Sequence, residues 1–200
     1  MDMENVNNNS NSFDPAGQGP DPELQLLARV RQREKWAFEE LYRRYFKKIY
    51  RFSARILRDT SHTEDVINET MYVVWNKPFS FDGTCRLSTW IFGIAFNKAR
   101  KYADPRMVMR AADDDDSDEI DNNEIATNCS LELLENRELV EFALTALSDE
   151  QRAVVELTYF HDFSYREIAL IMQCSENTVK TRMFYARKKL YEKISETHSR

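Results

Sequence analysis

The segment 164–190, SYREIALIMQCSENTVKTRMFYARKKL, limits the possible folds more than any other part of the chain. Ser164 and Glu167 have the spacing of a capping box, in which the Ser hydroxyl accepts a backbone N–H and the Glu carboxylate reaches back. A helix that starts there would bury Ile168 and Ile171. After the short break QCS, Ser175 can cap a second helix. Two helices joined by about four residues form a helix-turn-helix.

The second of these helices has two different faces. Its apolar residues recur at helical spacing, at Val179, Met183, Ala186, Leu190 and Ile194. On the opposite side, small polar groups near the amino-terminal end can reach base edges, and the basic groups further along suit phosphates. This pattern predicts binding to duplex DNA, although a helical hairpin with a solvated basic face would look similar. The candidate DNA-binding residues are Asn177, Thr178, Lys180, Thr181, Phe184, Arg187 and Lys188.

The remainder of the chain also has helical periodicity. From residue 23 onward apolar side chains recur at steps of three and four, and we find no alternating strand pattern of useful length, so we predict an all-α fold. One helix is expected to be capped by Thr60 or Ser61. Pro78 and Gly83 then break the pattern, Ser88 or Thr89 restarts it, and the pair Asp104-Pro105 closes it.

Charge is distributed unevenly along the chain. The net charge of −6 combines a basic block at 28–58, with eleven Lys and Arg against three Glu, and a second at 175–200, with seven against three. Between them, 105–141 holds twelve Asp and Glu against three Arg. Two basic blocks around an acidic one suggest two modules that meet a polyanion, and solvated helix faces are the plainer alternative. We predict a disordered tail, 1–22, two helical domains, 23–104 and 131–200, and a flexible acidic linker, 105–130.

Several classes of protein do not fit the sequence. No apolar run approaches the roughly 20 residues of a membrane span, and the Asn- and Ser-rich start lacks the apolar core of a signal peptide, so we expect a cytoplasmic protein. The three cysteines are far apart and lack CxxC spacing, which argues against disulfides and zinc. The His residues are scattered, and no Gly-rich phosphate loop exists. We therefore expect no catalytic residue, no metal site and no cofactor.

Four segments, in this order, resemble the extracytoplasmic-function class of bacterial sigma factors. AFEELYRRYFKKIYRFSARIL, HTEDVINETMYVVW and FDGTCRLSTWIFGIAFNKARKY are similar to the family's amino-terminal domain. LSDEQRAVVELTYFHDFSYREIALIMQCSENTVKTRMFYARKKL is similar to its carboxyl-terminal domain. The resemblance implies a subunit that binds core RNA polymerase, directs it to certain promoters and helps to separate the DNA strands. Many members of the family are held by an anti-sigma factor, and the residues leave open whether this chain has one.

The resemblance also implies roles for particular residues. In the family, the helix that reads TEDVINETMYVVW here docks on the clamp of the largest polymerase subunit, which assigns core-polymerase binding to Asp65, Asn68, Glu69 and Thr70. The loop and helix that follow correspond to the part that opens the −10 element. The carboxyl-terminal helix-turn-helix corresponds to the reader of the −35 element. The residues assigned to −10 DNA binding are Arg86, Trp90, Asn97, Lys98, Arg100 and Lys101, with Trp90 equally consistent with a core residue or a DNA wedge.

Two positions depart from the family pattern. Family members usually carry a basic residue where this chain has Gly93 and an aromatic residue near Leu87. A phosphate contact is therefore expected to be missing, which leaves promoter melting to rely more on Arg86, Lys98 and Arg100.

Two other functions remain open at this level. A repressor or activator that binds duplex DNA without polymerase would account for the carboxyl-terminal half alone. A helical adaptor that binds only protein would show no DNA affinity, whereas phosphate neutralisation makes DNA affinity fall steeply with salt.

Overall fold

The computed structural model describes residues 21–58, 60–103 and 142–198. Most of the predicted tail and all of the predicted acidic linker, 105–130, lie outside these ranges, as does the helix end expected at Asp104-Pro105. The last two residues of the predicted tail are helical or capping. Asp21 accepts the Glu23 N–H at 2.8 Å, and Pro22 occupies the first turn, where a missing N–H costs no hydrogen bond.

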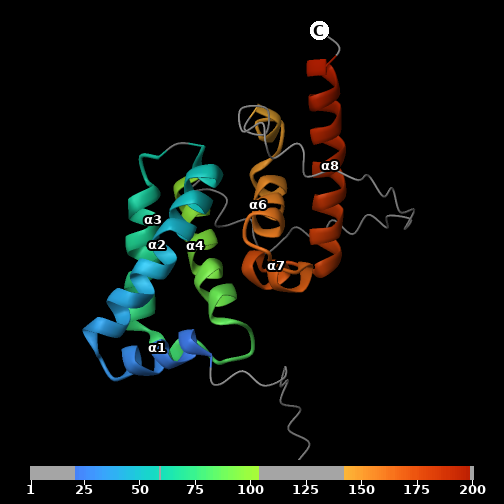
Figure 1. The fold of residues 1–200 in the computed structure, drawn as a ribbon. Helices are drawn as coiled ribbons and strands as arrows, with labels where there is room; N and C mark the ends of the chain where they lie inside the picture. The colour runs from blue at the N-terminus through green and yellow to red at the C-terminus, as the bar shows by residue number, and fades with distance from the viewer. Residues whose placement is uncertain (1–20, 59, 104–141, 199–200) are drawn as a thin grey trace, which may run out of the picture.

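Four α-helices and one 3-10 turn form the described part of the amino-terminal half (Figure 1). Helix α1 is followed by the long helix α2, and α3 is separated from α4 by the short turn η1 and a loop. Gly83 in this loop has φ +80°, which favours glycine. The bounds are α1 Pro22–Arg31, α2 Lys35–Leu57, α3 Thr63–Asn76, η1 Pro78–Ser80 and α4 Leu87–Ala103.

Two predicted helix starts differ from the observed ones. Helix α3 begins at Thr63 with His62 as its N-cap residue, later than the expected caps Thr60 and Ser61. The Thr63 side chain is buried, so packing sets the first turn. Helix α4 begins at Leu87, one residue before Ser88, because the buried Leu87 side chain anchors that turn in the core.

The carboxyl-terminal half contains the predicted helix-turn-helix. Ser164 and Glu167 form both bonds of the capping box at the start of α7, and the Thr178 N–H donates to Ser175 Oγ at 3.0 Å. Gln173 ends α7 in the left-handed region with φ 55°. A second capping box, between Ser148 and Gln151, starts α6. The bounds are α6 Asp149–Tyr159, α7 Tyr165–Met172 and α8 Glu176–His198.

The two halves share one hydrophobic core. Helix α4 packs against α7, and α2 packs against α6. The described residues contain only helices, turns and loops, which confirms the all-α fold. Among the described helices, none combines the length and apolarity needed to cross a bilayer.

Candidate functional site

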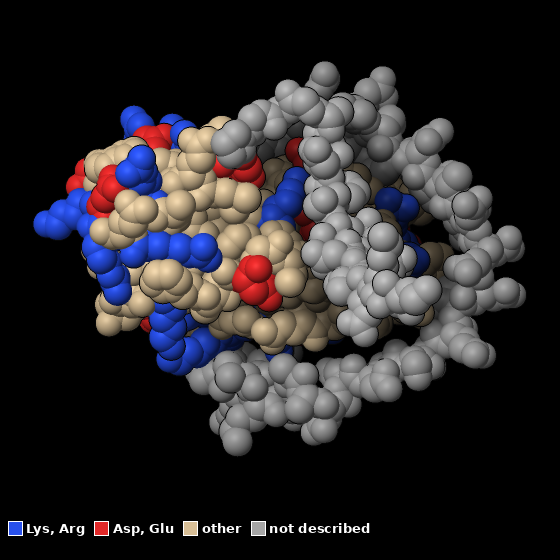
Figure 2. Space-filling model, turned by 90° about the horizontal axis from the view of Figure 1, so that it is seen from below, with Lys and Arg blue, Asp and Glu red and all other residues tan. Residues whose placement is uncertain are grey.

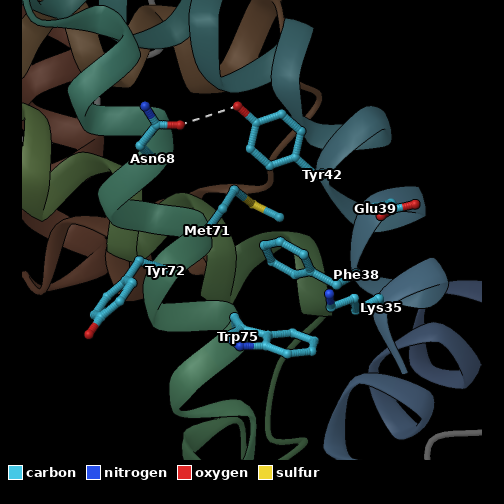
Figure 3. A pocket seen from close by; sticks show the side chains of 8 residues that line it. All are labelled: Lys35, Phe38, Glu39, Tyr42, Asn68, Met71, Tyr72 and Trp75. Carbon is cyan, nitrogen blue, oxygen red and sulfur yellow. Dashed lines mark hydrogen bonds between the residues drawn. The ribbon is translucent and has the colours of Figure 1, made fainter. Parts of the chain in front are cut away.

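An apolar groove lies on the surface between α2 and α3 (Figure 3). Phe38 and Trp75 meet at its lower end with ring centroids 5.1 Å apart, and at its upper end the Tyr42 hydroxyl donates to Asn68 Oδ1 at 3.2 Å. Tyr72 stands at its edge with 68% of its surface exposed. The groove has a volume of about 530 Å³ and is lined by Lys35, Phe38, Glu39, Tyr42, Asn68, Met71, Tyr72 and Trp75. We call it the α2–α3 groove.

In the structure, the residues that the resemblance assigned to polymerase binding lie in different environments. Asn68 lines the groove, and Asp65 is exposed one turn away, within 3.2 Å of His62. Thr70 is buried, and its hydroxyl donates to the Val66 carbonyl at 2.7 Å. Thr70 therefore holds α3 from inside and does not reach the surface.

Glu69, which the resemblance assigned to polymerase binding, faces α4. Its carboxylate accepts a hydrogen bond from Lys98 Nζ at 2.6 Å and another from the Tyr102 hydroxyl at 2.6 Å. The hydrogen bonds from Lys98 and Tyr102 hold the pKa of Glu69 below its usual value. The hydrogen bond between Tyr102 and Glu69 raises the pKa of Tyr102 to about 12. Lys98 is therefore engaged with α3 in this arrangement.

The groove is also lined by Tyr72, Trp75 and Phe38, which were not among the predicted site residues. Asn68, Tyr72 and Trp75 follow one another at steps of four and three, which places them on one face of α3. This spacing is the feature of the sequence that indicates a shared surface for these three residues. The Trp75 ring is half-buried at the groove.

The −10 candidates on α4 occupy different environments. Asn97 and Lys101 are exposed, and the Arg100 guanidinium lies 5.5 Å from the centre of the Phe96 ring. Trp90 is half-buried and packs on Phe81, with ring centroids 5.6 Å apart. Its position is thus at the edge of the core.

Arg86 contacts the other half of the molecule. Its Nε forms an ion pair with Glu167, the capping-box residue of α7, and its guanidinium lies 5.4 Å from the centre of the Phe163 ring. Glu167 is partly buried, which alone would raise its pKa, but the bonds from Arg86 and Ser164 hold that pKa below its usual value. The Glu167 carboxyl is therefore ionised at neutral pH.

One exposed aromatic side chain beside these residues was not among the predicted site residues. Phe79 lies in η1 with 74% of its surface exposed. Arg31 supports it from α1, because the guanidinium lies 5.4 Å from the ring centre and donates to the Pro78 and Phe81 carbonyls at 3.2 and 2.8 Å. A fixed, exposed ring next to a cation is a suitable platform for stacking an unpaired base.

Helix α8 presents the predicted DNA-binding face. Val179, Met183 and Ala186 are buried as expected, and Asn177, Lys180 and Lys188 are exposed. Phe184 is 37% exposed and contacts Tyr185 edge to face, which disfavours a role in the core.

Three other predicted residues of α8 are constrained. The Thr178 hydroxyl lies 2.8 Å from Ser175 Oγ in the cap, and Thr181 is half-buried. Arg187 Nε donates to the Tyr159 hydroxyl on α6 at 3.2 Å. These three residues are therefore less available to DNA than the sequence predicted.

Positive charge also gathers on the amino-terminal half. Figure 2, a view from below, shows Lys and Arg side chains over the part that contains α1 to α3, with some acidic side chains between them. On α2, the exposed side chains of Arg43, Lys47 and Arg51 recur at steps of four. Within the described ranges, no group of three or more His, Cys, Asp or Glu is arranged to hold a metal ion.

Two family descriptions match the chain. "Sigma-70 region 2" matches residues 41–104, which include α3 and α4, and "Sigma-70, region 4" matches residues 137–190, which include the helix-turn-helix. The ECF RNA polymerase sigma factor SigL of Mycobacterium tuberculosis is 31% identical over 150 residues, covering 73% of this chain and 82% of that protein. The ECF RNA polymerase sigma-E factor of Escherichia coli K12 is 29% identical over 177 residues, covering 84% and 92%.

Solved structures have a similar fold. The sigma factor RpoE of Bartonella quintana, in complex with the anti-sigma factor NepR, superposes with a TM-score of 0.57 at 28% identity, covering 79% of this chain and 96% of that one. CnrH in complex with the cytosolic domain of CnrY gives a TM-score of 0.62 at 20% identity, covering 87% and 97%.

Proposed function

The chain belongs to the extracytoplasmic-function class of RNA polymerase sigma factors, and from this premise we propose which of its surfaces bind polymerase and which bind promoter DNA. As a member of this class it acts with core RNA polymerase and initiates transcription at specific promoters. The chemistry of nucleotide addition belongs to the polymerase, so we assign this chain no catalytic residue.

The polymerase clamp binds the α2–α3 groove. The carrying observation is an apolar groove in which the exposed Tyr72 stands with the half-buried Phe38 and Trp75. The polar groups Asn68 and Asp65 lie beside them on α3, the helix that the family uses for this contact. An apolar groove with a polar rim suits a helical partner, and aromatic side chains supply much of the energy at interfaces. Glu69 and Thr70 contribute by holding α3 in place from below.

The amino-terminal half of α8 reads the −35 element in the major groove. Lys180 and Phe184 project from the side opposite the buried stripe, where a helix in the groove meets base edges. Lys188 lies further along, where phosphates are closer. Arg187 can contact the same DNA phosphates once its hydrogen bond to Tyr159 is broken.

The surface around η1 and α4 holds the melted −10 element. Phe79 stacks an extruded base, and Arg86, Asn97, Arg100 and Lys101 supply hydrogen bonds and positive charge. An anti-sigma factor is a further candidate partner, because a relative of similar fold is bound to one.

Binding to core polymerase followed by promoter opening tests this assignment. The purified chain should co-purify with core polymerase, and the mixture should open a subset of promoters that core polymerase alone does not open. A duplex-DNA repressor would bind a promoter without polymerase and open none. A protein-only adaptor would show no salt-dependent affinity for DNA.

A further inference from the structure

The turn η1 holds Phe79 between two anchored residues. Pro78 and Phe81, on either side of the turn, are buried, whereas 74% of the Phe79 surface is exposed. Within the turn, the backbone N–H and the hydroxyl of Ser80 both donate to the Lys77 carbonyl, at 3.0 and 2.7 Å. The backbone of the turn is therefore fixed while the Phe79 ring stays open to solvent.

A side chain from α1 closes this turn. Arg31, the last residue of α1, donates from Nε to the Pro78 carbonyl at 3.2 Å and from Nη2 to the Phe81 carbonyl at 2.8 Å. These two carbonyls flank Phe79, and the guanidinium also lies 5.4 Å from the centre of the Phe79 ring. A guanidinium makes these contacts together because its donors are held in a rigid fork, whereas a Lys ammonium is a single compact group.

The core fixes the position of Arg31. Leu27 and Val30, in the same part of α1, are no more than 1% exposed, so the end of the helix cannot move away from η1 without exposing apolar surface. Arg29, in the same turn of α1, instead forms an ion pair with Glu34 at 3.1 Å and has a side chain that is 55% exposed. Arg29 therefore offers a control with the same charge in the same helix.

A second arginine, just past the end of α1, makes the same kind of contact with α3. Arg33 Nη1 donates to the Trp75 carbonyl at 2.7 Å, and its guanidinium lies 5.4 Å from the centre of the Trp75 ring. Its backbone has φ 64°, in the left-handed region that Gly adopts more readily. Such strain persists where surrounding contacts hold it, and it often marks a functional position. The end of α1 thus contacts one aromatic residue of each proposed surface.

We propose that Arg31 and Arg33 are positioning residues, with Arg31 presenting Phe79 to an unpaired base of the −10 element and Arg33 presenting Trp75 to polymerase. The proposal rests on the proposed function, because it assumes these binding surfaces for Phe79 and Trp75. Each arginine limits the orientations that its aromatic partner samples before binding. The entropy cost of ordering that ring in the complex is lower as a result.

The affinity of the assembled holoenzyme for single-stranded DNA tests the role of Arg31. The probe is a fluorescent oligonucleotide with the −10 non-template strand of a promoter that the holoenzyme opens. We expect Phe79→Ala to weaken binding roughly 10-fold through the loss of one stacked base, and Arg31→Ala to weaken it roughly 5-fold. Arg31→Lys should lose nearly as much, because it keeps the charge without the fork. Arg29→Ala should keep the parent affinity.

The combination of Arg31→Ala with Phe79→Ala distinguishes positioning from a direct phosphate contact or a general role in stability. If Arg31 acts through Phe79, the double variant should bind no more weakly than Phe79→Ala alone. Losses that add in the double variant overturn the positioning role, as does parent affinity of Arg31→Ala when Phe79→Ala is weakened. Parent affinity of Phe79→Ala overturns the proposed stacking itself, and the role of Arg31 falls with it.

Arg33→Gly tests the second arginine by titration with core polymerase. Because Gly accepts the left-handed backbone, this variant should keep the helicity of the parent. We expect it to bind polymerase roughly 5-fold more weakly and, once assembled, to bind the oligonucleotide like the parent. Arg31→Ala should show the opposite pattern. Parent affinity of Arg33→Gly for polymerase, when Trp75→Ala is weakened, overturns the role of Arg33. Loss of both activities in either arginine variant overturns the division of roles.

Discussion

The α2–α3 groove and the contact of Arg86 and Thr89 with Glu167, which we call the α4–α7 junction, differ in what they expose. The groove leaves the aromatic side chain of Tyr72 open to solvent, whereas the junction buries Thr89 and engages the exposed Arg86 in an ion pair with Glu167. The surface proposed for polymerase thus offers apolar groups to a partner, and one residue of the surface proposed for DNA is paired with the other half of the molecule.

Removing the buried charge beside the junction should have the largest effect on stability. We expect Glu156→Gln to lower the free energy of unfolding by about 3 kcal/mol, because Arg55 would lose its charged partner at a site sheltered from water. Urea unfolding followed by circular dichroism measures the change. The exposed pair of Lys193 and Glu196 serves as control, and Glu196→Gln should cost less than about 1 kcal/mol. Equal effects of the two variants would mean that the junction is not held by this ion pair.

A charge placed in the groove should weaken polymerase binding without affecting the fold. We expect Tyr72→Glu to reduce affinity for core polymerase roughly 30-fold, about 2 kcal/mol, because it removes an exposed aromatic anchor and adds a group that resists desolvation. The matched control is Tyr191→Glu on α8, where the side chain is 65% exposed and far from the groove. Both affinities are measured by titration with labelled chain. Similar losses for the two variants would remove the groove from the interface.

Acid should loosen the junction through His161. Burial, with Lys48 and Arg55 nearby, lowers the pKa of His161 to about 4, so the packed ring stays neutral, whereas a ring released to solvent is protonated near pH 6.5. The stability of this packing is therefore full above pH 6.5 and falls as the pH drops toward 4. We expect a loss of about 1 to 2 kcal/mol between pH 7.5 and 5, which His161→Leu should abolish. An unchanged pH profile in this variant would exclude His161 as the cause.

The smallest expected effects are those on the recognition of the −35 sequence by α8. Phe184→Ala should cost about 1 kcal/mol on the preferred −35 sequence and relax selectivity at one or two base pairs. Lys188→Ala should weaken all sequences alike and reduce the salt slope by about one unit. Selection from randomised −35 elements with the assembled holoenzyme distinguishes the two variants. Identical preferred bases for Phe184→Ala and the parent would contradict base reading by this side chain.

Local rules predicted the helices and the helix-turn-helix well, because both depend on neighbouring residues. The capping box at Ser164 and Glu167 and the buried stripe through Val179 and Met183 are observed as expected. Helix starts were less accurate where a tertiary contact decides them, as at Leu87. The proposed flexibility of 105–130 concerns residues outside the described ranges and stays a prediction.

Long-range contacts could not be predicted from the sequence. Arg86 and Glu167 are 81 residues apart, and Arg55 and Glu156 are 101 apart, so no local pattern relates them. Helical periodicity likewise does not reveal that Lys98 and Tyr102 face Glu69. Gly93 was interpreted as a missing phosphate contact, and the structure adds that it lies against Ile171.

The distance between spin labels on cysteines introduced at Ala28 in α1 and Glu192 in α8, both exposed, tests the contrast between groove and junction most directly when it is measured in the free chain and again in complex with core polymerase. We predict one narrow distance distribution in the free chain and a longer distance in the complex, because polymerase binds the open groove and the two DNA-reading halves separate. The same narrow distribution in both samples would contradict this account.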